Sequence, residues 1–140
     1  MKRILVTLLT AVGITGPFVA HLAAQSNPEV ADVPFAFVVS HHTMPAGQYY
    51  VSQLKSGSPV FLLRNSERHT TFVQLSGREG GKPANPSLTF ACYGKECVLA
   101  KITPPGGRAA YALSESSIEK NLSHKMGMAS MISVRLGAQR

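Results

Sequence analysis

Short apolar stretches separated by turn-forming residues run through most of the sequence and constrain its fold more than any other feature. In the segment 33–39, apolar residues occupy every second position, which is the pattern of a strand buried on one side: Val33, Phe35, Phe37 and Val39. Other stretches rich in aromatic and β-branched residues are QYYVSQL, PVFLLRN, HTTFVQL, SLTFACY, ECVLAKI and RAAYAL. Segments such as MPAG, KSGS and TPPGG separate them. Short strands with turns about every 10 residues are typical of antiparallel sandwiches and barrels.

One segment near the C-terminus has the signals of a helix instead. Ser116 and Glu119 form a capping-box pattern after Ser114, and the pattern stops at Gly127. Between them, apolar residues recur every four positions: Ile118, Leu122 and Met126. Such a stripe would pack on a sheet, and the stretch MISVRL after it predicts a closing strand. We therefore expect a mainly β fold, an antiparallel β-sandwich or barrel of about 7–8 short strands with one α-helix near the C-terminus.

The first residues have the layout of a secretory signal peptide, with two basic residues, an apolar run and then small residues. We place the cleavage site between Ala24 and Gln25, with cleavage after Ala23 as a close alternative. A membrane anchor that stays attached is the other interpretation, but the apolar run is short for a span of about 20 residues and is interrupted by Gly and Pro. Residues 1–24 are therefore predicted to be a signal peptide, and residues 25–140 a single all-β domain without a membrane span, exported to the periplasm or secreted.

The basic charge of the chain is spread along its length. The sequence has 14 Lys and Arg against 7 Asp and Glu, a formal net charge of +7. Removing Lys2 and Arg3 with the signal peptide leaves 12 against 7, or +5. No run of three basic residues occurs, whereas a nucleic-acid-binding surface would have a cluster or stripe. The composition argues against nucleic-acid binding and allows a weak attraction to an acidic envelope or polysaccharide.

Cys92 and Cys97 are the only two cysteines, and they lie in the stretch FACYGKECVLA. If Gly94 and Lys95 form a two-residue hairpin turn, the cysteines face each other as a non-hydrogen-bonded pair with Cα atoms about 4.5 Å apart, which is close enough for a disulfide. The same register continues outward with Phe90 facing Leu99 and Leu88 facing Lys101.

Two other roles for the cysteines are less consistent with the sequence. A structural zinc site needs four ligands, and a redox catalyst more typically has the spacing C-x-x-C. An exported chain also meets an oxidising compartment, where paired cysteines tend to form a disulfide. We therefore predict that a disulfide between Cys92 and Cys97 braces a hairpin.

The sequence does not contain a recognisable catalytic motif. The pattern G-x-S-x-G is absent, and GREGGK lacks the spacing of a phosphate-binding loop. His41 and His42, next to a reversal predicted at residues 40–41, are weak candidates for metal ligands, because adjacent residues in an extended chain point to opposite sides. We assign no catalytic residue, no metal site and no cofactor from the sequence.

Several of these stretches together resemble a known pattern: VPFAFVV, TMPAGQYYV, VFLLRN, LTFACYG and CVLAKI. Followed by a short polar helix, they resemble a family of small exported proteins of soil bacteria without assigned function. Its members typically read V-P-F-x-F near the mature start, then T-L-P-A-G-x-Y-x-V, then F-x-x-Y-G before a strand. The resemblance covers residues 33 to about 122 and implies a shared all-β fold but no catalytic residues. The chain departs from the pattern at residues 40–42, where a Gly-Asn-type turn is usual, and in its two cysteines.

These observations favour an exported, non-enzymatic β-domain that binds envelope or extracellular material or assembles with itself. Self-assembly would use an open sheet edge that accepts a strand from a neighbouring subunit. The alternative is a small hydrolase or metal-dependent enzyme built on polar residues that come together from loops: His41, His42, His69 and Glu67.

Overall fold

The computed structural model describes residues 27–138 except for positions 56, 68, 81–84 and 107–108. The predicted signal peptide and its cleavage site between Ala24 and Gln25 lie outside the described residues. The described elements are, in chain order, β1 (Glu29–Val33), β2 (Phe37–Val39), β3 (His42–Met44), β4 (Gly47–Gln53), β5 (Val60–Asn65), β6 (Thr70–Gln74), β7 (Gly77–Gly80), β8 (Ser87–Tyr93), β9 (Glu96–Thr103), β10 (Ala109–Ala112), α1 (Ser117–Met126), β11 (Ser130–Arg135) and β12 (Gly137–Ala138).

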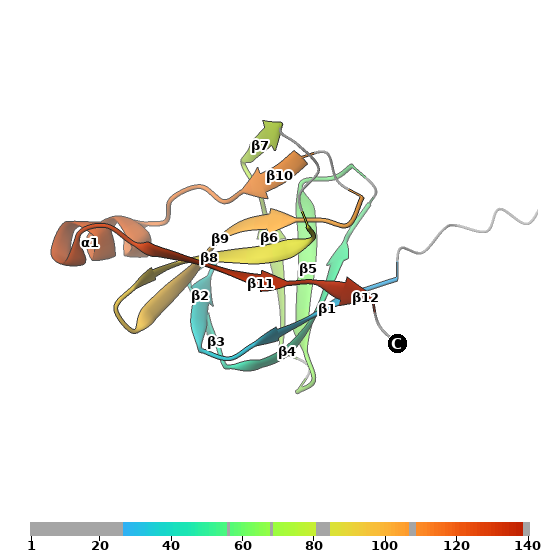
Figure 1. The fold of residues 1–140 in the computed structure, drawn as a ribbon, viewed down its shortest axis with the longest axis horizontal. Coiled ribbons are helices and arrows are strands. Elements are labelled where there is room, and N and C mark those ends of the chain that lie inside the picture. Colours follow the sequence, from blue (N-terminus) through green and yellow to red (C-terminus); the bar gives the residue numbers. More distant parts are fainter. Residues whose placement is uncertain (1–26, 56, 68, 81–84, 107–108, 139–140) are drawn as a thin grey trace, which may run out of the picture.

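These strands form two sheets (Figure 1). The first has the order β12-β1-β4-β5-β6, and the second has the order β11-β8-β9-β10-β7, with β2 paired to β9 and β3 paired to β2. The predicted mainly β fold with one helix near the C-terminus is confirmed, and the sheets are arranged as a sandwich rather than a closed barrel. The described residues form twelve strands instead of the expected 7–8, and the pairing of β2 with β9 is parallel.

The main core lies between the two sheets, where alternating side chains of the strands meet. Its largest fully buried side chains include three aromatic residues in contact, Phe37, Tyr49 and Phe90. The ring of Phe37 meets Phe90 with centroids 5.0 Å apart and Tyr49 with centroids 5.1 Å apart, both edge to face. Because Tyr49 belongs to β4 in the first sheet and the two phenylalanines to β2 and β8 in the second, these contacts join the sheets.

The segment 33–39, predicted as one strand, is two strands in different sheets. β1 ends at Val33 in the first sheet and β2 begins at Phe37 in the second. Pro34 has no N–H to donate to a strand ladder, which favours an end of pairing at this point. The predicted alternation is nevertheless correct, because its apolar side chains are buried or packed against the core: Val33, Phe35, Phe37 and Val39.

The chain reverses at Ser40 and His41, as predicted, and then returns to the first sheet. These two residues have positive φ angles of 48° and 69°, as a two-residue type I′ turn requires. The segment MPAG connects β3 in the second sheet to β4 in the first. At this crossover the Tyr49 hydroxyl donates a hydrogen bond of 2.5 Å to the Pro45 carbonyl, which ties the core tyrosine to the connection that precedes it.

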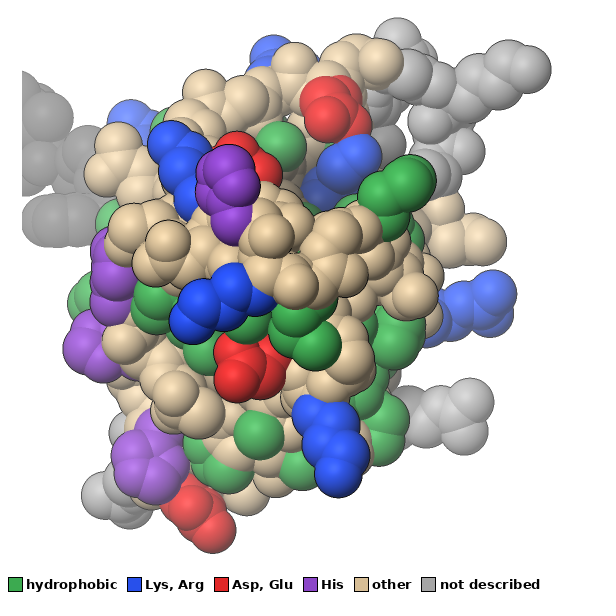
Figure 2. Space-filling view, turned by 90° about the vertical axis from the view of Figure 1, so that its left-hand side faces the viewer, with side chains coloured by type: hydrophobic (Ala, Val, Ile, Leu, Met, Phe, Trp, Pro, Cys, Tyr) green, Lys and Arg blue, Asp and Glu red, His purple; other side chains and the backbone are tan. Residues whose placement is uncertain are grey.

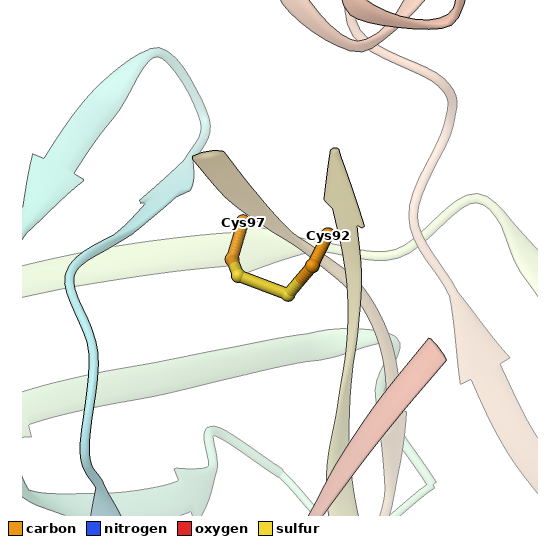
Figure 3. The surroundings of a disulfide bond; sticks show 2 residues. All are labelled: Cys92 and Cys97. Carbon is orange, nitrogen blue, oxygen red and sulfur yellow. A yellow bond between two sulfur atoms is a disulfide. The ribbon is translucent and has the colours of Figure 1, made fainter. Parts of the chain in front are cut away.

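The hairpin with the two cysteines has the predicted turn, and the predicted disulfide is confirmed (Figure 3). Gly94 has a φ of 63° at the turn, and Cys92 on β8 pairs with Cys97 on β9. Their Cα atoms are 4.0 Å apart, and both side chains are buried at the edge of the main core. The disulfide is compatible with an oxidising location.

Farther from the turn, the predicted register of this hairpin is wrong. Phe90 pairs with Leu99 as expected, but Leu88 pairs with Ile102 instead of Lys101, because Ala100 is an extra residue in a β-bulge. Without the bulge, Lys101 would point into the core. The observed register instead turns it to the other face of the sheet.

Lys101 has a partner on that face. Its Nζ donates a hydrogen bond to the carboxylate of Glu79 on β7. The bulge therefore places an aliphatic side chain in the core and leaves the charged one partly exposed and paired, which avoids the large cost of burying an unpaired charge.

Helix α1 packs on the face of β8 and β9 that points away from the main core. The Ser116 hydroxyl accepts a hydrogen bond of 3.1 Å from the Glu119 N–H, so the predicted N-cap is confirmed. Ile118 and Leu122 pack in a second cluster that contains Ala91, Tyr93 and Val98. Met126, predicted to extend this stripe, is instead 54% exposed. Within the described part of the chain, no helix is long and apolar enough to cross a membrane.

Replacing both Cys92 and Cys97 by serine should lower the free energy of unfolding by about 2 kcal/mol, because the disulfide closes only a short loop. The variant should still fold, since domains are typically stable by about 5–15 kcal/mol. Urea denaturation of the parent and the variant measures the difference. Thiol titration of the unfolded, unreduced parent should detect no free thiol, and two free thiols per chain would contradict the disulfide.

Candidate functional site

A groove opens where β9 changes its neighbour. Along one edge, the first part of β9 pairs with β2, through Val98 and Val38, and the later part pairs with β10, through Lys101 and Ala112. The groove lies at this change of partner and has a volume of about 490 Å³. Its walls come from the end of β2, from β9 and from the connection between β10 and α1.

The groove combines an apolar floor with a polar rim. Val38, Val98 and Leu113 are among the apolar residues that line it. The rim includes two glutamates at the start of α1, Glu115 and Glu119, together with the serines around them. Such a combination of apolar surface and a few polar groups is typical of ligand-binding sites.

The two glutamates make the groove locally negative in a chain of positive net charge. Burial raises the pKa of the Glu119 carboxyl group, and the negative charge of Glu115 raises it further, while a hydrogen bond with the Ser116 backbone lowers it. Burial also raises the pKa of the nearby Tyr93 hydroxyl, and the charges of Glu119 and Glu115 add to that effect. Glu119 is therefore a partly desolvated carboxylate that would be stabilised by a positive group.

The histidines considered as metal ligands or catalytic groups are divided between two places. His41 lines the groove, whereas His42 and His69 line a second pocket of about 220 Å³. Glu67 lies beside His69, with a carboxylate oxygen 3.6 Å from Nδ1, and both side chains are largely exposed. Asn65 orders this loop, since its side-chain oxygen accepts a hydrogen bond of 2.8 Å from the His69 N–H.

The weak metal candidates His41 and His42 thus line different pockets, His41 from the turn, where its φ is 69°, and His42 from the start of β3. Across the described residues, no three His, Cys, Asp or Glu side chains are grouped as possible metal ligands. The structure does bring His42 on β3 to the same pocket as His69, beside which Glu67 lies, and the sequence could not show this because β3 and the β5–β6 connection are far apart in the chain.

The groove itself was missed by the sequence interpretation. Glu119 was recognised only as part of a helix cap, and Val38, Val98 and Leu113 only as residues of apolar stretches. They meet because β2 and the connection after β10 lie on the same edge of β9. No local pattern reports such a meeting, since its members are far apart in the sequence.

Comparison with known proteins adds no relative from which a role could be transferred. No family model matches the chain, and no curated protein or solved structure shows significant similarity to it. What the groove can do is therefore inferred from its own residues. An apolar floor beside two carboxylates suits a ligand that joins an apolar portion to a positive group.

Replacing Glu119 by glutamine should stabilise the protein at neutral pH. The folded state raises the pKa of Glu119, so it binds the proton more tightly than the unfolded chain does, and stability increases as the pH falls through the folded-state pKa. Glutamine is neutral and keeps the capping-box geometry. Urea denaturation at several pH values should show a gain at neutral pH that disappears in acid.

The exposed Glu96 on the hairpin provides the control, because glutamine at this position should not produce the same pH-dependent gain. An E119Q variant less stable than its parent at neutral pH would contradict the unfavourable burial of this carboxylate.

Proposed function

We propose that the protein is an exported, non-enzymatic β-domain that binds envelope or extracellular material, and that the groove beside Glu115 and Glu119 is its binding site. The observation that carries this proposal is the partly buried Glu119 carboxylate above an apolar floor. The groove has more than twice the volume of the pocket at His42, about 490 Å³ against about 220 Å³. Export and the resemblance to small proteins of soil bacteria are parts of the same proposal and come from sequence motifs.

The chemistry of the groove favours ligands that carry amines, such as polymers with amino sugars or peptides with lysine side chains. A cation placed next to Glu119 would offset the repulsion from Glu115 and the cost of burial. The positive net charge of the chain opposes the binding of a cation in the groove only weakly, because charges more than about 8 Å away are largely screened at physiological ionic strength. The local glutamates therefore determine which charge the groove accepts.

The proposal is tested with two probes that share one sugar backbone and differ at the amines: a glucosamine oligosaccharide with free, positively charged amines and the same oligosaccharide with its amines acetylated and therefore neutral. The mature protein should bind the free-amine form more tightly in isothermal titration calorimetry, and added salt should weaken this binding. Amide signals of Val98 and Leu113 should shift in NMR spectra, since both residues line the groove.

A variant with both Glu115→Gln and Glu119→Gln should bind the free-amine probe at least about tenfold more weakly, since a hydrogen bond to a charged group contributes about 1.5–3 kcal/mol. The variant Glu96→Gln changes the net charge by one unit at an exposed residue that does not line the groove, and it should bind like the parent. Equal binding of both probes, or unchanged binding by the double variant, would refute the groove as the site. Cleavage of the bound probe would support the hydrolase alternative instead.

A further inference from the structure

Three methionines are exposed within the sequence HKMGMASM, which contains the end of α1 and the beginning of β11. The exposed fractions of Met126, Met128 and Met131 are 54%, 98% and 59%. Methionine is usually a buried residue, and Met44, the other methionine among the described residues, is only 4% exposed. Packing within the described chain does not explain why three methionine side chains are exposed to solvent in so short a segment.

Met126 and Met131 both lie on the α1 side of the hairpin that carries the two cysteines. The methyl carbon of Met126 lies against the turn, 2.8 Å from the position that a Cβ on Gly94 would occupy. Met131 pairs with Ala91 on β8, and paired residues of neighbouring strands point to the same face. Ala91 belongs to the cluster under α1, so Met131 also lies on the α1 side of the sheet.

Met128 lies between them in the link from α1 to β11. Met128 follows Met126 by two positions and precedes Met131 by three. Its Cα atom is therefore at most about 7 Å from that of Met126 and at most about 11 Å from that of Met131. A methionine side chain is unbranched and has three rotatable bonds. A shared metal ion at this segment would require the three flexible side chains to turn their sulfur atoms toward one point.

Thioether sulfur is a soft, neutral ligand that selects soft cations such as Cu(I) over hard ones such as Mg²⁺ or Ca²⁺. Thiols are not available for this role in the described structure, because both cysteines are joined in the disulfide. His124 is also exposed, but it precedes Met126 by two helical positions, which is about 200° around the helix axis. The methionines are thus the only clustered soft ligands in the described part of the chain.

We propose that Met126, Met128 and Met131 bind one soft monovalent cation, Cu(I) or Ag(I), through three thioether sulfurs. The site lies at the end of α1, whereas the acidic groove lies at its start. Figure 2 looks at the end of the sandwich that carries α1 and shows the histidines toward its left-hand side, with hydrophobic side chains spread over the face. The methionine site does not depend on the ligand proposed for the groove.

Silver(I) is the probe for this site, because it has the softness of Cu(I) without its redox chemistry. The mature protein, labelled with ¹³C in its methionine methyl groups, is titrated with silver nitrate in a chloride-free buffer. The signals of Met126, Met128 and Met131 should shift together and saturate at one equivalent, while that of Met44 stays unchanged. Zinc(II) should not shift them, and Cu(I) should displace the silver.

Leucine substitutions distinguish a metal site from an apolar contact surface, because leucine keeps the apolar area and removes the sulfur. The triple variant M126L/M128L/M131L should lose the stoichiometric binding, and each single variant should bind at least about tenfold more weakly, as expected when a metal site is disturbed. The variant His124→Ala should bind like the parent. Silver binding retained by the triple variant, or three methyl signals that respond independently without saturating at one equivalent, would overturn the proposal.

Discussion

The contact of Phe37 with Phe90 and Tyr49 joins the two sheets, and the path of the chain around this contact determines the rest of the structure. The chain leaves the first sheet after Val33, places Phe37 in the core from β2, reverses at Ser40 and returns through MPAG to β4. These two changes of sheet place β2 beside β9 in parallel orientation. One wall of the groove therefore follows from the same crossing that buries the central aromatic side chains.

Helix α1 connects the two candidate sites. Leu122 packs against the outer face of β8 and β9 and holds the helix in place. The start of the helix then lies at the groove, which Glu115 and Glu119 help to line. Its end leads through Gly127 into the exposed methionine segment beside β8. A single packed helix thus presents hard carboxylate oxygens at one end and soft thioether sulfurs at the other.

The features that the sequence predicted correctly depend on neighbouring residues. The alternation around Phe37, the N-cap at Ser116 and the disulfide across a Gly94 turn each involve interactions over a few positions. The errors begin where a longer-range contact takes over. The predicted pair of Leu88 with Lys101 fails because the bulge at Ala100 turns the lysine toward Glu79, which lies far away in the sequence. Met126 fits the helical stripe, yet it extends beyond the covered surface and remains exposed.

The sequence by itself determined which side of most strands is apolar, where the chain turns and that two cysteines face each other, because local backbone preferences and the two-residue period of a strand are sufficient for these features. Tertiary structure alone decided that residues 33–39 divide between two sheets, that β9 has both β2 and β10 on one edge, and that Glu119 and Val98 line one groove. The physical reason is that strand pairing is made between segments distant in the chain. Which segments meet is set by how all of them pack around one core, and no short pattern records that outcome.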